Sequence, residues 1–219
     1  MQHDCLIFDL DGTISDPGPG IIRSINFALI EQGHKARPDE EIGALIGLPL
    51  DEMFERLLGD SVRQESSTLV GKYRERYISV GYRENTLYDG VEAFLKLVHQ
   101  EAEQRLGVCT SKRVDVAEKI LELFELRPLF DFVSGGDIGI EKSSQLKQLL
   151  ESGSITDRSL MIGDRFIDLA AAHHNGLEAA AVLWGYGSRQ ELEKENPQYL
   201  LECPAQLNAL QREQKNNRS

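Results

Sequence analysis

The sequence predicts an α/β fold, a doubly wound parallel sheet of the Rossmann-like kind that an all-helical insert interrupts near its start. Three observations support this prediction. A short apolar run at residues 5–8 has the length of a buried parallel strand. Helical patterns without a strand pattern then fill residues 16–84. After residue 89, strand and helix patterns alternate, as they do when helical crossovers join parallel strands.

The helices of the insert have recognisable start and stop signals. Proline opens the second and third helices, at Pro38 and Pro49, and glycine ends the first three. We expect helices from residue 21 to Gly33, from 38 to about 47, from 49 to 59 and from about 60 to 80.

The alternating part that follows supplies the other elements of the sheet. Helices are expected around residues 91–98, 114–124, 146–150 and 167–172, and strands around 106–109, 132–133, 160–162 and 179–183. The expected division is a discontinuous α/β part, residues 1–15 and 86–219, and a helical part, residues 16–85. The polar tail at 211–219 is expected to fray.

The composition limits the class of function. The chain has 219 residues, 24 Lys and Arg against 36 Asp and Glu, and a formal net charge of −12. Its hydrophobic fraction of 41% excludes a mostly disordered chain. The acidic balance argues against nucleic acid and anionic membranes as partners, because both favour a basic face.

The same sequence gives expectations about location. No apolar run approaches the roughly 18 residues of a membrane span, and the N-terminus lacks a basic secretory signal. The three cysteines form no C-x-x-C pair, so a reducing compartment fits best. We therefore expect a cytoplasmic protein, with Cys5 and Cys109 as buried structural thiols.

Two aspartates follow the first strand in the segment FDLDGT at residues 8–13. Asp9 and Asp11 would lie at a strand end, where α/β proteins form ligand sites. Neighbouring carboxylates repel each other unless a cation intervenes, and Mg²⁺ prefers oxygen ligands. The pair also suits a nucleophile and an acid–base group. The alternative is a simple Asp-Gly turn.

A second acidic segment, GDRFID at residues 163–168, follows the apolar run at 160–162. Asp164 would lie at the end of that strand, and Asp168 one helical turn later on the same side. Asp164 could instead be the N-cap of the next helix. Two acidic strand ends in one sheet nevertheless make a cation site the better interpretation.

Two further segments could bind an anion. Thr110 and Ser111 follow the strand at 106–109, and hydroxyls there can bind phosphate oxygens together with backbone N–H groups. Lys142 lies at an expected helix start, where the helix dipole disfavours a cation and so invites a functional reason. The alternatives are a Thr or Ser N-cap and a solvated lysine.

In their order along the chain, at residues 8–13, 110–111, 142 and 163–168, the four segments resemble the sequence motifs of the haloacid dehalogenase (HAD) superfamily of hydrolases. The resemblance covers residues 4–210 and implies a HAD core with an α-helical cap, as in the phosphoglycolate-phosphatase-like branch. It implies a Mg²⁺-dependent phosphatase that hydrolyses a small phosphorylated metabolite through an aspartyl-phosphate. Asp11 favours phosphoryl transfer, because superfamily members that attack carbon lack an acid–base Asp there.

The resemblance also implies a role for each site residue. Asp9 would be the nucleophile and Asp11 the acid–base group. Mg²⁺ would be held by the Asp9 carboxylate, the Asp11 backbone carbonyl and Asp164. The phosphoryl group would be bound by Thr110, Ser111 and Lys142, and Lys142 would also act in catalysis. Asp168 would support Lys142 or the metal ligands.

The cap would choose the substrate, because the core binds only the phosphoryl group. Candidate contacts are Arg23, Arg56, Tyr82 and Arg83 for an anionic or aromatic substrate, whereas Phe27 and Phe54 are expected in the cap core. Cap hinges are expected near residues 15–20 and 81–89. Two segments, at residues 16–21 and 84–90, also look like a 5′-nucleotidase subset of the branch. A 5′-nucleotidase is therefore the main alternative.

Other functions are less favoured. They are a pyrophosphatase, a phosphosugar mutase of the β-phosphoglucomutase kind and a binding module that has lost catalysis. The intact set of Asp9, Asp11, Thr110, Lys142 and Asp164 argues against a non-catalytic module. The expected partner is a small phosphorylated substrate, with the chain as a monomer or a weak homodimer.

Overall fold

The computed structural model describes residues 3–59, 65–136 and 140–211. Within them, six parallel strands form one sheet in the order β5-β4-β1-β6-β7-β8. These strands are β1 (Cys5–Phe8), β4 (Arg105–Thr110), β5 (Phe132–Gly135), β6 (Ser159–Gly163), β7 (Glu178–Val182) and β8 (Tyr199–Leu201). The first strand of the chain is thus central in the sheet, and the strand order reverses beside it. Ligand sites form at such switch points.

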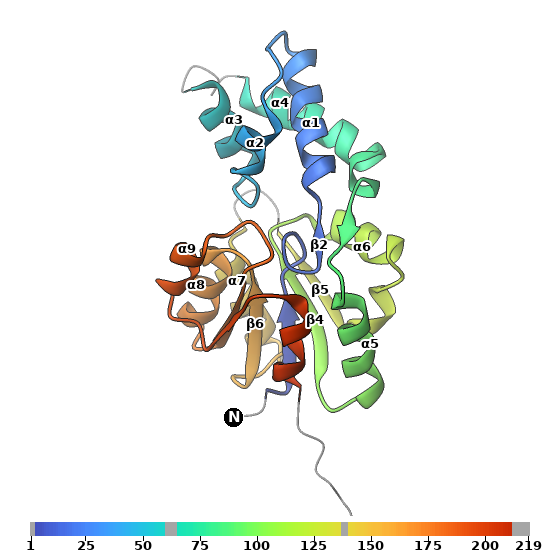
Figure 1. Cartoon of the computed structure of the whole chain (residues 1–219), viewed down its shortest axis with the longest axis vertical. Coiled ribbons are helices and arrows are strands. Elements are labelled where there is room, and N and C mark those ends of the chain that lie inside the picture. The colour runs from blue at the N-terminus through green and yellow to red at the C-terminus, as the bar shows by residue number, and fades with distance from the viewer. Residues whose placement is uncertain (1–2, 60–64, 137–139, 212–219) are drawn as a thin grey trace, which may run out of the picture.

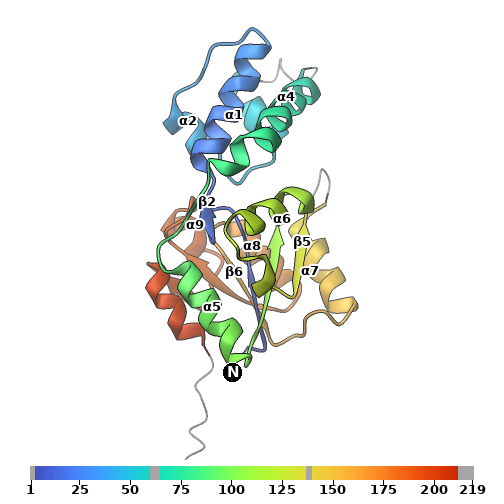
Figure 2. The ribbon, with the colours of Figure 1, turned by 90° about the vertical axis from the view of Figure 1, so that its right-hand side faces the viewer.

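Helices cover both faces of this sheet (Figure 2). β1 is buried along its whole length, and its side chains alternate between the two faces. Leu6 and Phe8 belong to the hydrophobic cluster that includes α5 (Val91–Glu101) and α6 (Val114–Leu123). Cys5 and Ile7 belong to the cluster that includes α7 (Lys142–Glu151) and α8 (Phe166–His174). The predicted doubly wound α/β fold is confirmed.

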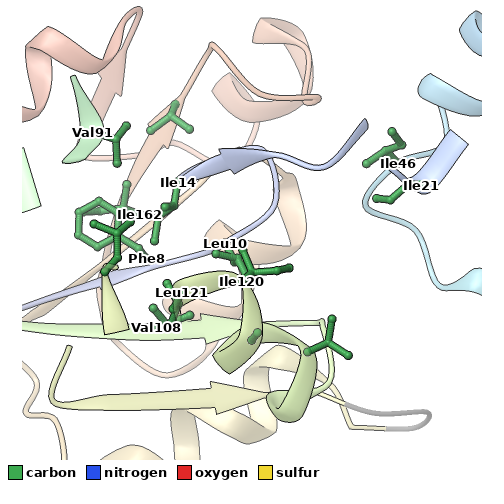
Figure 3. Packing of buried hydrophobic residues seen from close by; sticks show 14 of the residues in the cluster. Phe8, Leu10, Ile14, Ile21, Ile46, Val91, Val108, Ile120, Leu121 and Ile162 are labelled. Carbon is green, nitrogen blue, oxygen red and sulfur yellow. The ribbon is translucent and has the colours of Figure 1, made fainter. Parts of the chain in front are cut away.

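The centre of the first cluster follows from the strand register. Phe8 lies opposite Val108 of β4 and Ile162 of β6. Figure 3 shows these side chains with Ile120 and Leu121 of α6, which pack over them. Burying each large side chain contributes about 1.5–3 kcal/mol. This packing fixes the carboxyl ends of three neighbouring strands relative to one another.

The helical insert consists of α1 (Gly18–Glu31), α2 (Asp39–Gly43), α3 (Leu50–Leu58), α4 (Ser66–Ser79) and the 3₁₀ turn η2 (Gly81–Arg83). It lies at one end of the molecule, connected to the sheet region through β2 (Ser15–Asp16) (Figure 1). Ile25, Leu29 and Phe54 are among its fully buried side chains. An inserted all-helical unit is therefore present, whereas the boundaries expected at 15/16 and 85/86 stay a prediction.

Some elements differ from the expectations. β2 pairs antiparallel with β3 (Thr86–Leu87), a two-residue ladder too short for a periodic pattern. α2 ends at Gly43 rather than near Gly47, whose φ of +98° is incompatible with a helix. Among the described residues, the pattern also missed five short elements, η2, η3 (Arg127–Leu129), α9 (Arg189–Glu193), β8 and η4 (Pro204–Leu210). The start of the expected fourth helix and the tail from 212 onward lie outside the described residues.

Two smaller expectations can also be compared with the structure. Cys5 and Cys109 are buried free thiols, and burial raises the pKa of each to about 12, as expected for structural cysteines. Across the described ranges, every helix is too short or too polar to cross a lipid bilayer.

Candidate active site

Asp9 directly follows β1, and its backbone N–H continues the pairing with β6 through a 2.8 Å bond to the Ile162 carbonyl. The chain then turns at once. Gly12 has a φ of +83°, and a Cβ at this position would lie 2.1 Å from Oδ2 of Asp164. Glycine is therefore required here by both the backbone conformation and the close approach of the second acidic segment. The Asp-Gly segment therefore does form the turn that was the alternative interpretation, and this turn is part of the candidate site.

Lys142 begins α7 and is 5% exposed. Its Nζ lies 2.9 Å from Oδ1 of Asp9 and also donates a hydrogen bond to Oδ1 of Asp168. Burial alone would lower the pKa of Lys142, but Asp168 and Asp9 outweigh it, so the pKa is raised and the ammonium stays charged. The alternative of a solvated lysine is wrong.

Asp164 follows β6 and is fully buried. Its Oδ2 accepts the backbone N–H of Tyr186 at 2.7 Å, and its Oδ1 lies 3.4 Å from the Thr13 hydroxyl. The N-cap of α8 is Arg165, so the alternative that Asp164 is the cap is wrong. Burial, followed by the charges of Asp168 and Asp9, raises the pKa of Asp164 well above its usual range.

Asp168 closes the capping box of α8, because its Oδ2 accepts the backbone N–H of Arg165 at 3.0 Å. The other carboxyl oxygen accepts the bond from Lys142. Burial raises the pKa of Asp168 to about 6, although Lys142 opposes this shift. The same residue thus fixes the helix start and the lysine, as expected for a supporting group.

Asp9, Asp164 and Asp168 form a buried cluster in which one carboxylate oxygen from each residue lies within 4.8 Å of the other two. When all three carboxylates are ionised around the one ammonium, two negative charges remain without a counter-charge. A hard divalent cation such as Mg²⁺ prefers oxygen ligands and would balance those charges. The donor set therefore fits the expected metal.

Asp11 lies next to this cluster but has a different partner. Its Oδ2 lies 2.8 Å from Nζ of Lys112, whereas its Oδ1 is buried without a hydrogen-bond partner among the described residues. Burial raises the pKa of Asp11, while Lys112 acts in the opposite direction. One oxygen of the carboxyl group is thus paired, while the other is buried and has no partner among the described residues.

The end of β4 supplies Thr110, Ser111 and Lys112. Thr110 is buried, and its Oγ1 accepts the backbone N–H of Lys112 at 3.2 Å. Gln145 of α7 donates to the Thr110 carbonyl at 3.1 Å, so this strand end is attached to the helix that begins at Lys142. Sequence reasoning assigned no role to Lys112, although it directly follows the two hydroxyl residues.

A cavity of about 1410 Å³ lies between the sheet edge and the insert. The core contributes Asp11, Ser111, Lys112 and Lys142, and the insert contributes Leu50, Met53, Arg56, Val70, Tyr73 and Tyr77, among others. Residues of the proposed site and of the insert therefore face one space. A ligand there could contact both.

The cap candidates separate into two groups. Arg56 lines the large cavity, where it also pairs with Glu52 at 2.6 Å. Arg23 instead pairs with Glu84 at 2.9 Å and lines a smaller cavity of about 340 Å³. Tyr82 lies outside the described lining of both cavities and contacts Arg83. The structure thus brings Arg56, but neither Arg23 nor Tyr82, to the space beside Asp11.

Two contacts between the core and the insert region carried no signal in the sequence. Arg165 donates to the backbone carbonyl of Ile46 and pairs with Glu191 at 3.1 Å. The hydroxyl of Tyr186 donates to Asp16 in β2, while its backbone N–H binds Asp164. In both contacts the partners are far apart in the sequence, so no local sequence pattern predicts them.

Comparison with known proteins agrees with this geometry. Residues 6–182 match the haloacid dehalogenase-like hydrolase family. The chain is 34% identical over 202 residues to a 5′-nucleotidase of Pseudomonas aeruginosa, with 90% of each chain covered. It is 32% identical over 189 residues to a phosphoglycolate phosphatase of Cereibacter sphaeroides, covering 83% of this chain and 85% of that one.

The chain is also similar to a tyrosine-protein kinase and to a hydrolase of known structure. The tyrosine-protein kinase PtkA of Mycobacterium tuberculosis is 30% identical over 194 residues, which are 86% of this chain and 65% of the kinase. A haloacid dehalogenase-like family hydrolase from Streptococcus pneumoniae superposes with a TM-score of 0.87 at 25% identity, covering 94% of this chain and 97% of that one. The chain therefore belongs to the haloacid dehalogenase-like hydrolases and is a phosphatase of that family.

Proposed function

We propose that the chain is a Mg²⁺-dependent phosphatase that hydrolyses a small phosphorylated metabolite through an aspartyl-phosphate on Asp9. The observation that supports this most strongly is the meeting of Asp9, Lys142, Asp164 and Asp168 at one sheet edge. These residues come from three separate segments of the chain. They meet beside a cavity that also contains Asp11.

Asp9 and Asp164 would hold the metal through their carboxylates, and Asp11 through its backbone carbonyl. Bound Mg²⁺ would supply charge compensation and orientation for a phosphate dianion, which the acidic cluster would otherwise repel. Asp168 would keep Lys142 in place, since it already accepts a hydrogen bond from the ammonium.

The chain's own residues account for the two chemical steps. In the first, an oxygen of Asp9 forms a bond to phosphorus, the ester P–O bond breaks, and Asp11 gives a proton to the leaving oxygen. In the second, Asp11 takes a proton from the water that attacks the phosphoryl group, and Asp9 is released. Lys142, Thr110 and Ser111 bind the phosphoryl oxygens. Positioning and charge stabilisation of this kind carry phosphoryl transfer.

Two substrate classes are supported. A small acid such as phosphoglycolate is supported by the phosphoglycolate phosphatase relative, and a cationic group such as Arg56 could bind its carboxylate. Nucleoside 5′-monophosphates are supported by the 5′-nucleotidase relative and by the size of the cavity, about 1410 Å³. Ligand pockets commonly measure roughly 300–1,000 Å³, so the larger substrate would also have room.

The test is phosphate release from a panel of phosphoglycolate, purine and pyrimidine 5′-monophosphates, sugar phosphates and pyrophosphate, with Mg²⁺ and with a chelator. We expect release that depends on Mg²⁺ and is lost in Asp9→Asn. Asp131→Asn is the matched control, because Asp131 is exposed, pairs with Arg105 and lies outside the lining of the large cavity. Full activity in Asp9→Asn, or no Mg²⁺-dependent release from any substrate, would overturn the proposal.

A further inference from the structure

Lys112 is a buried cation between the core and the insert that none of the expected roles uses. Its side chain is 10% exposed. The ammonium lies 2.8 Å from Oδ2 of Asp11, 3.0 Å from the hydroxyl of Tyr77 and 4.5 Å from the centre of the Tyr77 ring. Lys112 follows β4 of the core, whereas Tyr77 belongs to α4 of the insert. One ammonium therefore connects the predicted acid–base group to the insert.

These contacts account for the lysine's buried position. Taking an ammonium out of water is costly unless a counter-charge and hydrogen-bond acceptors replace the solvent. Asp11 supplies the counter-charge, and Tyr77 supplies an oxygen and the face of its ring. Tyr77 is itself buried and stacks on Tyr73 at a ring distance of 5.2 Å, so its position is set by the packing of α4.

The contact also makes the two oxygens of Asp11 different. Oδ2 is held by Lys112, while Oδ1 is buried and has no hydrogen-bond partner in the described part of the chain. A buried carboxyl oxygen without a partner is costly, and such atoms gather at functional sites. Asp11 and Lys112 both line the large cavity, so the pair lies where a substrate would bind.

We propose that Lys112 is a positioning residue for Asp11 and that Tyr77 of the insert completes this contact. This inference rests on the proposed function, in which Asp11 protonates the leaving oxygen. It adds that the acid–base group depends on a residue of the insert as well as on the core.

The role has a defined place in the first step. The ester P–O bond breaks, its electron pair moves to the leaving oxygen, and the proton of the Asp11 carboxyl passes to that oxygen. A negative charge then appears on Asp11, directly beside the Lys112 ammonium. Lys112 should therefore matter most when the leaving group needs a proton and least when it departs readily as an anion.

The test uses this dependence on the leaving group. For the full chain, kcat/KM with Mg²⁺ is measured on p-nitrophenyl phosphate and on the alkyl phosphate of the panel that the wild type hydrolyses best. The parameter kcat/KM covers binding and the step in which the alcohol departs. We expect Lys112→Met to lose about 30-fold or more on the alkyl phosphate and less than about threefold on the aryl phosphate, since acid–base groups contribute roughly 10²–10⁴-fold.

Matched variants separate positioning from general damage. Lys112→Arg keeps the positive charge and should restore part of the loss on the alkyl phosphate. Tyr77→Phe removes only the hydroxyl that Lys112 contacts, so we expect about a three- to tenfold loss on the alkyl phosphate alone. Lys147→Met and Tyr199→Phe make the same chemical changes at an exposed residue of α7 and at a residue of β8, both outside the cavity lining. Neither control should change the ratio of kcat/KM between the alkyl and the aryl phosphate.

The outcomes distinguish this inference from the proposed function. If the wild type shows no Mg²⁺-dependent release, the proposed function fails. If it is active but Lys112→Met and Tyr77→Phe lose the same factor on both substrates, or lose nothing, the positioning role is overturned and the phosphatase assignment stands. If Lys112→Met does not fold, Tyr77→Phe alone tests the positioning role, through its ratio of kcat/KM on the alkyl phosphate to kcat/KM on the aryl phosphate.

Discussion

The ammonium of Lys142 lies 2.9 Å from Oδ1 of Asp9, although the two residues are 133 positions apart in the sequence. Asp9 follows the central strand, and Lys142 is the first residue of α7. A cation at a helix start opposes the helix dipole, and burial adds a desolvation cost. The carboxylates of Asp9 and Asp168 offset both costs, so the lysine and the acidic cluster stabilise one another.

Lys142→Met should therefore destabilise the fold as well as abolish turnover. The substitution leaves Asp9 and Asp168 buried without their cation, a change that typically costs about 3–5 kcal/mol. The free energy of unfolding would be measured in urea at pH 7 with a chelator present. Lys147→Met is the control, because the Lys147 side chain is 69% exposed and its loss should cost less than about 1 kcal/mol. A similar small cost in both variants would contradict this account.

Asp164→Asn should have opposite effects with and without metal. In chelator the variant should be more stable than the wild type, because it removes one of three crowded carboxylates. The pKa of Asp164 is raised well above 3.8, so ionisation of this group disfavours the folded state and the variant's advantage should grow as pH rises above 3.8. Mg²⁺ should raise the melting temperature of the wild type, by the equivalent of ~2.7 kcal/mol at 100 times Kd.

The same variant should show little or no stabilisation by Mg²⁺. Differential scanning fluorimetry over a Mg²⁺ series at pH 5, 7 and 8 measures both effects. An Asp164→Asn protein that is less stable than the wild type in chelator, yet is stabilised equally by Mg²⁺, would show that Asp164 is a structural hydrogen-bond acceptor only.

Much of this cluster could be predicted from the sequence because it is built from strand ends. Asp9 and Asp164 follow apolar runs that could only be buried strands, and the carboxyl ends of parallel strands meet at one edge. Asp168 follows from the helical repeat. Lys142 was different, because its unfavourable position at a helix start made it only a candidate, and the resemblance to the family placed it in the site. For the three aspartates, the strand end or the helical repeat already indicated this edge of the sheet.

Contacts between the core and the insert could not be predicted in this way. Arg23 was a reasonable candidate by charge, but it pairs with Glu84 and lines the smaller cavity instead of the large one. Lys112 looked like an ordinary residue after a strand, because its partner Tyr77 lies 35 positions away on another unit. Such contacts depend on how the two units pack, and no periodic pattern encodes that packing.

Glu84 should stabilise the fold in a pH-dependent manner. Its carboxylate accepts hydrogen bonds from Arg76 and Arg23, both at 2.9 Å, and the bonds from Arg76 above all lower its pKa below 4.5. Because the folded pKa is depressed, this stabilisation is present above pH 4.5 and is lost as pH falls through the folded value. Glu84→Gln should cost about 1 kcal/mol at pH 7 and progressively less as the pH falls below 4.5.

Urea unfolding at several pH values measures this difference. Glu92→Gln is the control, because Glu92 forms an exposed pair with Lys96 in which both side chains are about half exposed. Exposed pairs of this kind contribute about 0–1 kcal/mol. A cost for Glu84→Gln that stays constant from pH 7 to pH 3 would show that the loss arises from packing rather than from the ion pairs.

Gly185→Ala should damage the metal site while leaving most of the fold in place. A Cβ at residue 185 would lie 2.3 Å from the Gly12 carbonyl oxygen and 2.4 Å from Oδ2 of Asp164, so either the loop or the carboxylate must move. Displacing a group that supports metal ligands typically lowers metal affinity about 10–100-fold, and we expect the loss of Mg²⁺ affinity to fall within that range.

Gly71→Ala is the matched control: nothing lies within 4 Å of its Cβ position inside α4, and alanine there should stabilise the helix by about 0.8–1 kcal/mol. Mg²⁺ titrations followed by melting temperature measure both variants. Unchanged Mg²⁺ affinity in Gly185→Ala would mean that the loop after β7 yields freely and does not set the position of Asp164.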